Sequence, residues 1–117
     1  MDCIFCKLAS GEIPTDVVYE DEKVFAFHDQ NPQADTHVLL IPKKHVSGLA
    51  DDDLYSAEFA ETREALWQAI PKVLKALDVD EQDGFRVIAN CGKGAGQSVF
   101  HLHFHLLSGS GLSERLV

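Results

Sequence analysis

Three histidines occupy alternate positions near the end of the chain, at His101, His103 and His105. A period of two is typical of a β-strand, so the three imidazoles are expected to share one face. The apolar residues between them would point to the opposite face and pack in a core: Leu102, Phe104 and Leu106. The pattern therefore predicts a strand within residues 100–107 that presents a row of bases titrating near neutral pH.

Such a row can do chemistry on phosphorus. A neutral imidazole is nucleophilic when a backbone carbonyl holds one ring N–H and leaves the lone pair of the other nitrogen free. Neighbouring imidazoles can donate hydrogen bonds to phosphate oxygens and to a leaving group. These groups fit nucleotidyl transfer to a histidine followed by hydrolysis, and they do not require magnesium. The alternatives are histidines without a function on an edge strand and a metal site built from all three.

A glycine-rich loop, residues 92–98, leads directly into the histidine row. It lacks the spacing of a P-loop. Its backbone N–H groups can form an anion-binding nest, and Asn90 and Ser98 can hold phosphate oxygens beside it. The alternative is a flexible hairpin connection, but the position of the loop favours phosphate binding.

Two cysteines near the N-terminus, Cys3 and Cys6, have the C-x-x-C spacing that can place two thiolates on one metal ion. A redox pair is the other reading, but no βαβ pattern surrounds the motif. Histidine is the obvious donor for the remaining ligands. The third cysteine, Cys91, is remote, and an odd count in a reducing compartment makes a disulfide framework improbable.

The remaining pattern predicts the elements that position these groups. Four further strands are expected at residues 17–20, 23–28, 36–42 and 85–90, with a hairpin at residues 21–22. Asp29 follows the second strand, where a turn and a ligand role are equally open. Three aspartates, at residues 51–53, are expected to cap a long helix in preference to binding a cation, and Pro71 should kink or split that helix. Ile4, Phe5 and Leu8 have the spacing of a short apolar helix. The sum is a single α+β domain over residues 1–117.

Composition narrows the class of protein. The chain has 117 residues and a formal net charge of −9, which disfavours binding to nucleic acids and to anionic membranes. A leader of basic and then apolar residues is missing at Met1, so the cytoplasm is the expected location. No run approaches the roughly 20 apolar residues of a transmembrane helix.

The row His101–Leu107 resembles the histidine triad pattern, in which three histidines alternate with apolar residues. The resemblance extends over nearly the whole chain, through residues 27–29, 32–34, 36–37, 41–45 and 96–99. It is closest to the Hint-like branch of the histidine triad (HIT) family, in which zinc-containing members occur. It implies a five-stranded antiparallel sheet with one main helix and a short N-terminal helix. Two such sheets would pair as a ten-stranded sheet in a homodimer.

The resemblance also implies roles for individual residues. His103 would be the nucleophile that becomes nucleotidylated, with His105, Ser98 and His37 completing the catalytic set. The nucleotide would be bound by a larger group: Ile4, Phe5, Leu8, Phe27, His28, Asp29, Asn90, Gly96, Gln97, Ser98, His103 and His105. A structural Zn²⁺ would be held by Cys3, Cys6, His45 and His101.

The implied activity is hydrolysis of purine nucleoside 5′-phosphoramidates or related nucleotidyl conjugates to the nucleoside monophosphate. The alternatives are a non-catalytic module that binds or senses purine nucleotides and a dinucleoside polyphosphate hydrolase of the Fhit-like type. Ser108-Gly109-Ser110 replaces a common Gly-Gly-Arg, and the short tail lacks the C-terminal aromatic of some relatives, so the pattern leaves the choice of leaving group open. Asp35 also departs from the pattern, in which an apolar residue or proline is common at this position.

Overall fold

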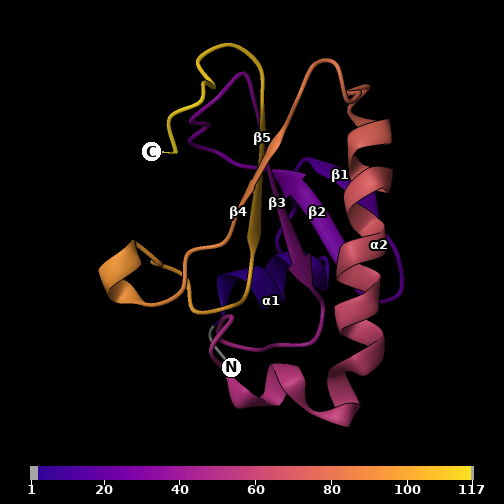
Figure 1. The fold of residues 1–117 in the computed structure, drawn as a ribbon. Helices are drawn as coiled ribbons and strands as arrows, with labels where there is room; N and C mark the ends of the chain where they lie inside the picture. Colours follow the sequence, from indigo (N-terminus) through magenta and orange to yellow (C-terminus); the bar gives the residue numbers. More distant parts are fainter. Residues whose placement is uncertain (1–2, 117) are drawn as a thin grey trace.

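The computed structural model describes residues 3–116 as one five-stranded antiparallel sheet with a helix on each face (Figure 1). The elements in chain order are α1 (Ile4–Ala9), β1 (Val17–Glu20), β2 (Val24–His28), β3 (Thr36–Pro42), α2 (Ala60–Ala76), β4 (Arg86–Ile88) and β5 (Phe104–Ser108). Three short 3-10 turns complete the fold: η1 (Asp52–Tyr55), η2 (Ala57–Phe59) and η3 (Lys93–Ala95). The α+β architecture expected from the sequence is confirmed.

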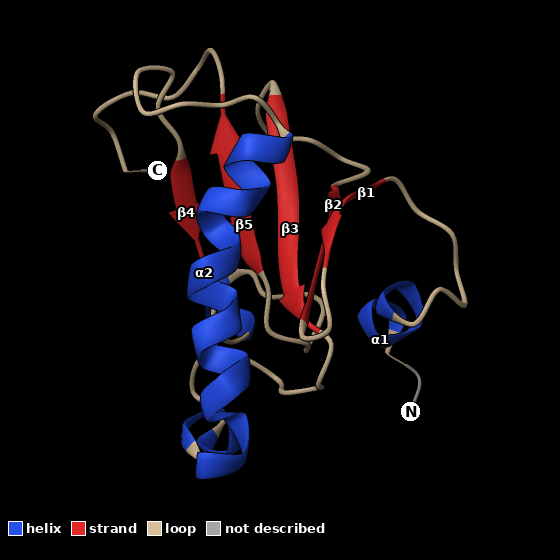
Figure 2. Cartoon of the chain, turned by 90° about the vertical axis from the view of Figure 1, so that its right-hand side faces the viewer, coloured by secondary structure: helices blue, strands red, loops and turns tan. Residues whose placement is uncertain are grey.

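The strands lie in the order β1-β2-β3-β5-β4, which Figure 2 shows from left to right in reverse. β5 therefore sits between β3 and β4, so the histidine strand is in the interior of the sheet. Leu39 of β3 and Ile88 of β4 both pair with His105. The order also leaves β1 and β4 as the two edges.

The two faces of the sheet bury different sets of residues. On one face, Leu102, Phe104 and Leu106 pack with Val73 and Leu66 of α2 in the larger core. On the other face, apolar residues of β2 and β3 pack against the short helix α1. The histidines share this second face, because the ring of His103 contacts Phe5 of α1. The alternation seen in the sequence thus separates a structural face from a chemical one.

The histidine strand is shorter than predicted. β5 begins at Phe104, and the residues before it bond to loops in place of a neighbouring strand. The N–H of Leu102 donates to the carbonyl of Val46, and the carbonyl of His101 accepts from a side chain. Residues 101–103 keep the alternation of a strand while their backbone groups serve the site.

The main helix also differs from its prediction. Asp51 is the cap that the sequence predicts, but it caps η1, and α2 starts only at Ala60. Pro71 does not split α2, which runs unbroken from Ala60 to Ala76. Pro71 is exposed, so the carbonyl that its missing N–H leaves without a helical partner can bond to water.

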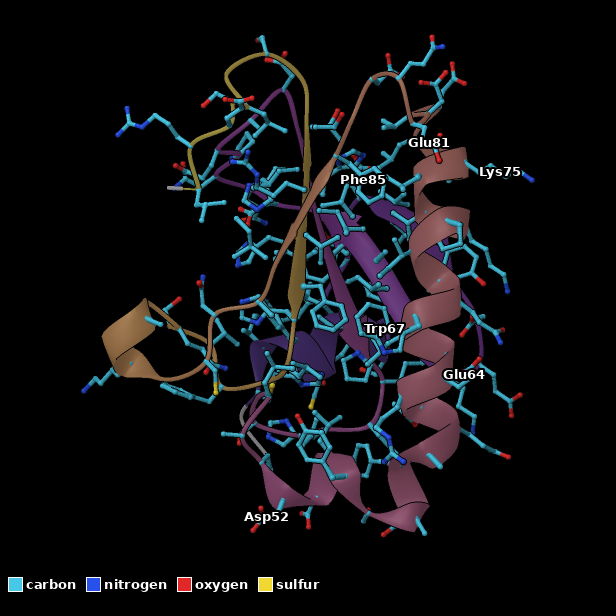
Figure 3. All side chains as sticks on the ribbon, viewed as in Figure 1. Asp52, Glu64, Trp67, Lys75, Glu81 and Phe85 are labelled. Carbon is cyan, nitrogen blue, oxygen red and sulfur yellow. The ribbon has the colours of Figure 1, made fainter. Side chains whose placement is uncertain are left out.

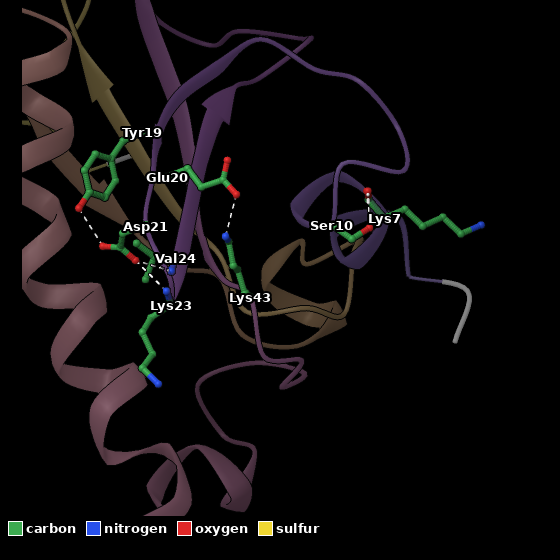
Figure 4. Close-up of polar contacts among 8 residues, drawn as sticks. All are labelled: Lys7, Ser10, Tyr19, Glu20, Asp21, Lys23, Val24 and Lys43. Atoms are coloured by element: carbon green, nitrogen blue, oxygen red, sulfur yellow. Dashed lines mark hydrogen bonds and ion pairs between the residues drawn. The ribbon is translucent and has the colours of Figure 1, made fainter.

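The turn between β1 and β2 is closed by one carboxylate (Figure 4). Asp21 accepts hydrogen bonds from the N–H groups of Lys23 and Val24 and from the hydroxyl of Tyr19, at 2.8–2.9 Å. These bonds hold the pKa of Asp21 below its usual value, although burial opposes them.

Within residues 3–116, no helix combines the length and apolar character that crossing a bilayer would need.

Candidate functional site

His103 has the geometry predicted for a nucleophilic imidazole. Its Nδ1 lies 2.8 Å from the backbone carbonyl oxygen of His101. A carbonyl only accepts hydrogen bonds, so Nδ1 carries the proton and Nε2 keeps its lone pair. The ring is 8% exposed and packs edge-on against Phe5, with 5.1 Å between the ring centroids. Burial and this contact hold the ring in one orientation.

His105 is oriented by a chain of hydrogen bonds that starts at a backbone amide. The N–H of Gln33 donates to Nδ1 of His37 at 3.0 Å, so the proton of His37 must be on Nε2. That Nε2 lies 2.9 Å from Nδ1 of His105, which therefore accepts. In a neutral His105 the proton is then on Nε2. The site places an N–H donor on His105 beside a lone pair on His103, with the two ring centroids 5.0 Å apart.

Both supporting histidines are neutral at neutral pH. Burial lowers the pKa of His105 to about 4, with smaller contributions from His103 and His37 and a small opposing one from Asp29. Burial also lowers the pKa of His37, and Asp29 opposes that change with its Oδ2 3.5 Å from Nε2. Neutral rings are what the assignment of protons above requires.

Asp29, His37 and His105 also lie close enough together to suggest a metal site, with their donor atoms within 4.8 Å of one another. The proton count argues against it. Nε2 of His37 would have to be a ligand, yet it carries the proton that the Gln33 N–H forces onto it. The cluster is a hydrogen-bonded relay that supports His105.

A pocket of about 280 Å³, slightly below the about 300–1,000 Å³ range of small-molecule sites, opens beside Phe5, the residue that packs on His103. Five of the predicted nucleotide-binding residues line it: Ile4, Phe5, Leu8, Phe27 and Asp29. Its walls also include residues that the sequence did not single out: Ile13, Thr15, Gln30 and Leu39. The strand register explains why Leu39 lines the pocket, because it pairs with both Phe27 and His105. The sequence alone does not give the strand order on which this pairing depends. Asp29 therefore places a carboxylate in a pocket whose other walls are mostly apolar.

His28 is placed differently from the other predicted pocket residues. It follows Phe27 on β2, so its side chain leaves the strand toward the opposite side. Its Nε2 lies 4.0 Å from Oδ2 of Asp16, and it is not among the residues that line the pocket.

The glycine-rich loop uses most of its own amides, contrary to the expected anion nest. The N–H groups of Ala95, Gly96 and Gln97 donate to carbonyls of Gly92 and Lys93. Gly96 has a φ of +90°, which the turn requires and which side chains disfavour. The amide of Gln97 is buried and bonds to Gly92, Ser47 and Val99, so it fastens the loop.

Asn90 and Ser98 flank this loop. Asn90 is half-buried and lies two residues beyond Ile88, which pairs with His105, so the chain carries it toward His103. Ser98 is exposed at the end of the loop, just before the histidine row. Both remain predicted phosphate contacts.

The four predicted metal ligands come together around His101, the first histidine of the row. Sγ of Cys6, Nδ1 of His45 and Nδ1 of His101 lie 3.2–3.5 Å from one another, and Sγ of Cys3 is 3.4 Å from Nδ1 of His101. The edges of a tetrahedral zinc site with two sulfur and two nitrogen ligands are about 3.3–3.8 Å, from the usual bond lengths. The donor set and its spacing therefore fit Zn²⁺.

The second nitrogen of His101 supports this fit. Its Nε2 donates to the carbonyl of Pro42 at 2.8 Å, which leaves Nδ1 unprotonated and aimed at the two sulfurs. Burial lowers the pKa of His101 to about 4, and the carbonyl of Pro42 opposes this change. Burial, with Cys3 beside it, raises the pKa of the Cys6 thiol to about 11, a trend that a bound divalent cation reverses.

Known proteins resemble this chain along most of its length. The HIT domain family matches residues 10–112. Protein HitA of Neisseria gonorrhoeae is 43% identical over 106 residues, covering 91% of this chain and 94% of that protein. A histidine triad protein from Clostridium difficile has a structure that superposes with a TM-score of 0.87 at 46% identity, covering 98% and 96% of the two chains. The structure of a HIT family hydrolase from Legionella pneumophila superposes with a TM-score of 0.85 at 40% identity, covering 97% of each chain.

Proposed function

The chain belongs to the HIT domain family, and on that premise we propose that it hydrolyses purine nucleoside 5′-phosphoramidates or related nucleotidyl conjugates to the nucleoside monophosphate. One observation carries the proposal. The rings of His103 and His105 lie with their centroids 5.0 Å apart, with a lone pair on Nε2 of the first and a proton on Nε2 of the second, and Phe5, which packs on His103, lines a pocket of about 280 Å³. A similar protein named as a HIT family hydrolase supports the reaction class.

In the first step, Nε2 of His103 attacks the α-phosphorus and the bond from phosphorus to the conjugate's nitrogen breaks. The amine departs with one proton taken from water. Nδ1–H of His103 stays on the carbonyl of His101 and shares the positive charge of the phosphorylated ring. Nε2–H of His105 donates to the charge that develops on the phosphate oxygens and on the leaving nitrogen.

In the second step, water attacks the same phosphorus and the bond to His103 breaks. The nucleoside monophosphate leaves, His103 returns to its neutral form and one proton goes back to water. Ser98 and Asn90 contact the phosphate, with Ser98 nearest to the departing group. Proton uptake and release balance over the cycle, so neutral His105 acts as a hydrogen-bond donor throughout.

The nucleoside is proposed to occupy the pocket beside α1. Ile4, Phe5 and Phe27 present apolar surface to a flat base, and Asp29 can accept hydrogen bonds from the ribose hydroxyls. The pocket is apolar on most sides, which suits the faces of a base.

We further propose that Cys3, Cys6, His45 and His101 hold a structural Zn²⁺. When bound, the ion closes the four-ligand cluster and adds folding free energy. The chain's own residues then link α1 to the histidine row, since Phe5 stands between the two cysteines in sequence and packs on His103.

A homodimer is also proposed. β4 is an edge of the sheet and carries the exposed Val87, with the exposed Phe85 directly before it, while the exposed Trp67 of α2 packs on Phe104 of the neighbouring strand β5. In Figure 3, Trp67 and Phe85 lie on the side of α2 that faces the sheet, at well-separated heights along the helix. Pairing of two β4 strands would cover this patch and form a ten-stranded sheet.

The test offers the protein an AMP–amine conjugate and a diadenosine polyphosphate at equal concentration and measures the release of AMP. Binding of AMP itself is measured separately. We expect the conjugate to be cleaved best and His103→Ala to abolish release. Preferred cleavage of the diadenosine compound would favour the dinucleotide activity. Tight binding of AMP without turnover of either compound would favour a nucleotide-binding module.

A further inference from the structure

The loop between β2 and β3, residues 29–35, supplies two groups to the site. Asp29 lines the pocket, and the N–H of Gln33 fixes the proton on His37. Two further bonds are internal to the loop, from Asn31 N–H to Asp29 at 2.8 Å and from the Gln33 side-chain amide to the carbonyl of Asn31 at 3.0 Å. At its start the loop is tied to β3, because the Asp29 N–H donates to the carbonyl of His37 at 3.0 Å. A second anchor at the far end would hold the Gln33 amide on His37.

Asp35 provides that anchor at the far end of the loop. Its Oδ2 accepts from both the N–H and the hydroxyl of Ser110, each at 2.8 Å. The two residues are 75 positions apart. In Figure 1 the β2–β3 loop and the chain after β5 lie next to each other, as these bonds require. Both bonds go to the charged form of the carboxyl, and they hold the pKa of Asp35 below its usual value.

Gly109 makes room for this contact. A Cβ at Gly109 would lie 2.5 Å from Cβ of Asp35 and 2.7 Å from its Oδ2. Its φ of +113° is a backbone conformation that other residues rarely adopt. The turn after β5 is thus shaped around the carboxylate of Asp35, and β5 also carries His105.

We propose that Asp35 is a positioning residue: by fastening the β2–β3 loop to Gly109 and Ser110, it keeps the Gln33 N–H on His37 and so sets which nitrogen of His105 bears the proton. This inference rests on the proposed function for its catalytic meaning. Its structural content, the state of two imidazoles in the ligand-free protein, is independent of any substrate.

The direct test is NMR of the histidine ring nitrogens in the ligand-free protein. We expect wild type to show His37 and His105 with the proton on Nε2. Asp35→Ala should give mixed proton positions on His37, and Asp35→Asn should restore most of the wild-type pattern because its amide oxygen still accepts from Ser110. Gly109→Ala should resemble Asp35→Ala, since its Cβ displaces the carboxylate.

Kinetics give the second readout. Asp35→Ala should lower kcat roughly ten-fold with KM changed by less than about two-fold, because a misdirected donor affects the transition state more than substrate binding. Asp21→Ala is the control: it removes a loop-closing carboxylate of similar kind, at the turn shown in Figure 4, which precedes β2, whereas the loop of Asp35 follows β2. It should lower thermal stability while leaving both ring patterns and kcat as in wild type.

The outcomes separate the two proposals. Mixed His37 signals in Asp35→Ala support the inference even if the wild type fails to cleave the conjugate, a failure that would count against the proposed function alone. Unchanged His37 and His105 signals in Asp35→Ala overturn the inference, whatever happens to activity. Equal disturbance by Asp21→Ala also overturns it, because the effect would then be general loosening of the fold.

Discussion

Nε2 of His37 lies 2.9 Å from Nδ1 of His105, and this contact decides which nitrogen of a neutral His105 carries the proton. The ring of His37 is buried, at 5% exposed. In the proposed mechanism it would therefore act through the orientation and proton position of His105.

Replacing His37 by Gln should lower kcat by about 10- to 100-fold, within the range of general acid–base effects, and leave KM within about two-fold. The side chain of Gln cannot both accept from Gln33 and donate to His105 with the fixed geometry of an imidazole. Steady-state kinetics on the AMP–amine conjugate measure this. A rise in KM with unchanged kcat would instead place His37 in substrate binding.

A nucleotidylated His103 should accumulate when the conjugate is mixed with enzyme and the reaction is stopped within its first turnover. Mass spectrometry of the digested protein should find one AMP group on the peptide that contains His103. Asn90→Ala should still form the adduct, more slowly, whereas His103→Ala should give none. An adduct on His105 or on Ser98 would refute the assignment of the nucleophile.

Metal analysis of the purified protein should find about one zinc per chain. Cys3→Ser should lose most of it, because the closed tetrahedral site needs four ligands. Cys91→Ser is the matched control, since Cys91 is exposed and outside the cluster. Chelation should lower the unfolding temperature of wild type and of Cys91→Ser by several degrees and should have little effect on Cys3→Ser. Equal zinc in both cysteine variants would contradict the ligand set.

Stability should fall as the pH drops from about 6.5 toward 4. The pKa of His105 is about 4 in the folded protein against 6.5 when unperturbed, so the unfolded chain binds more protons in this window. The folded state is favoured above pH 6.5 and loses on the order of 3 kcal/mol through this group as the pH reaches 4. Urea unfolding at several pH values measures it, and His105→Gln should show a shallower decline. An identical decline in both proteins would mean that other groups cause it.

Sedimentation or light scattering should give the mass of a dimer for the wild type. Val87→Asp places a charge on the exposed edge strand β4 and should give a monomer. Val17→Asp is the control, because Val17 is similarly exposed, at 47%, on the opposite edge strand β1. Dissociation by Val17→Asp, or a monomeric wild type, would exclude pairing through β4.

The alternation of the histidine row was enough to predict which residues face the core and which face the site. Leu102 and Phe104 lie against α2, and His103 lies against Phe5. The extent of the strand was not predictable, since it depends on where backbone groups of residues 101–103 find partners. The N–H of Leu102 bonds to Val46 and the carbonyl of His101 to the ring of His103.

The chain of hydrogen bonds from Gln33 through His37 to His105 could not be predicted from the sequence. It begins at the backbone amide of Gln33, and every residue except proline has such an amide. Likewise, spacing along the chain gives no sign that Asp35 meets Ser110. Asp35 and Ser110 were each recognised in the sequence as part of a departure from the histidine triad pattern. Only the fold shows that these two residues are in contact. Gln97, a predicted nucleotide contact, has a structural role that the sequence did not indicate, because its side-chain amide fastens its own loop.

The six-residue helix α1 has a consequence for engineering. It carries the aromatic and aliphatic wall of the pocket on Ile4, Phe5 and Leu8, while the reacting imidazoles belong to a different part of the chain. On the proposed function, base preference would depend chiefly on α1 and bond cleavage on the histidine row. Variation at the exposed Ile4 could then alter nucleoside selectivity, whereas Phe5, which packs on His103, and Cys6 of the metal cluster would have to be kept.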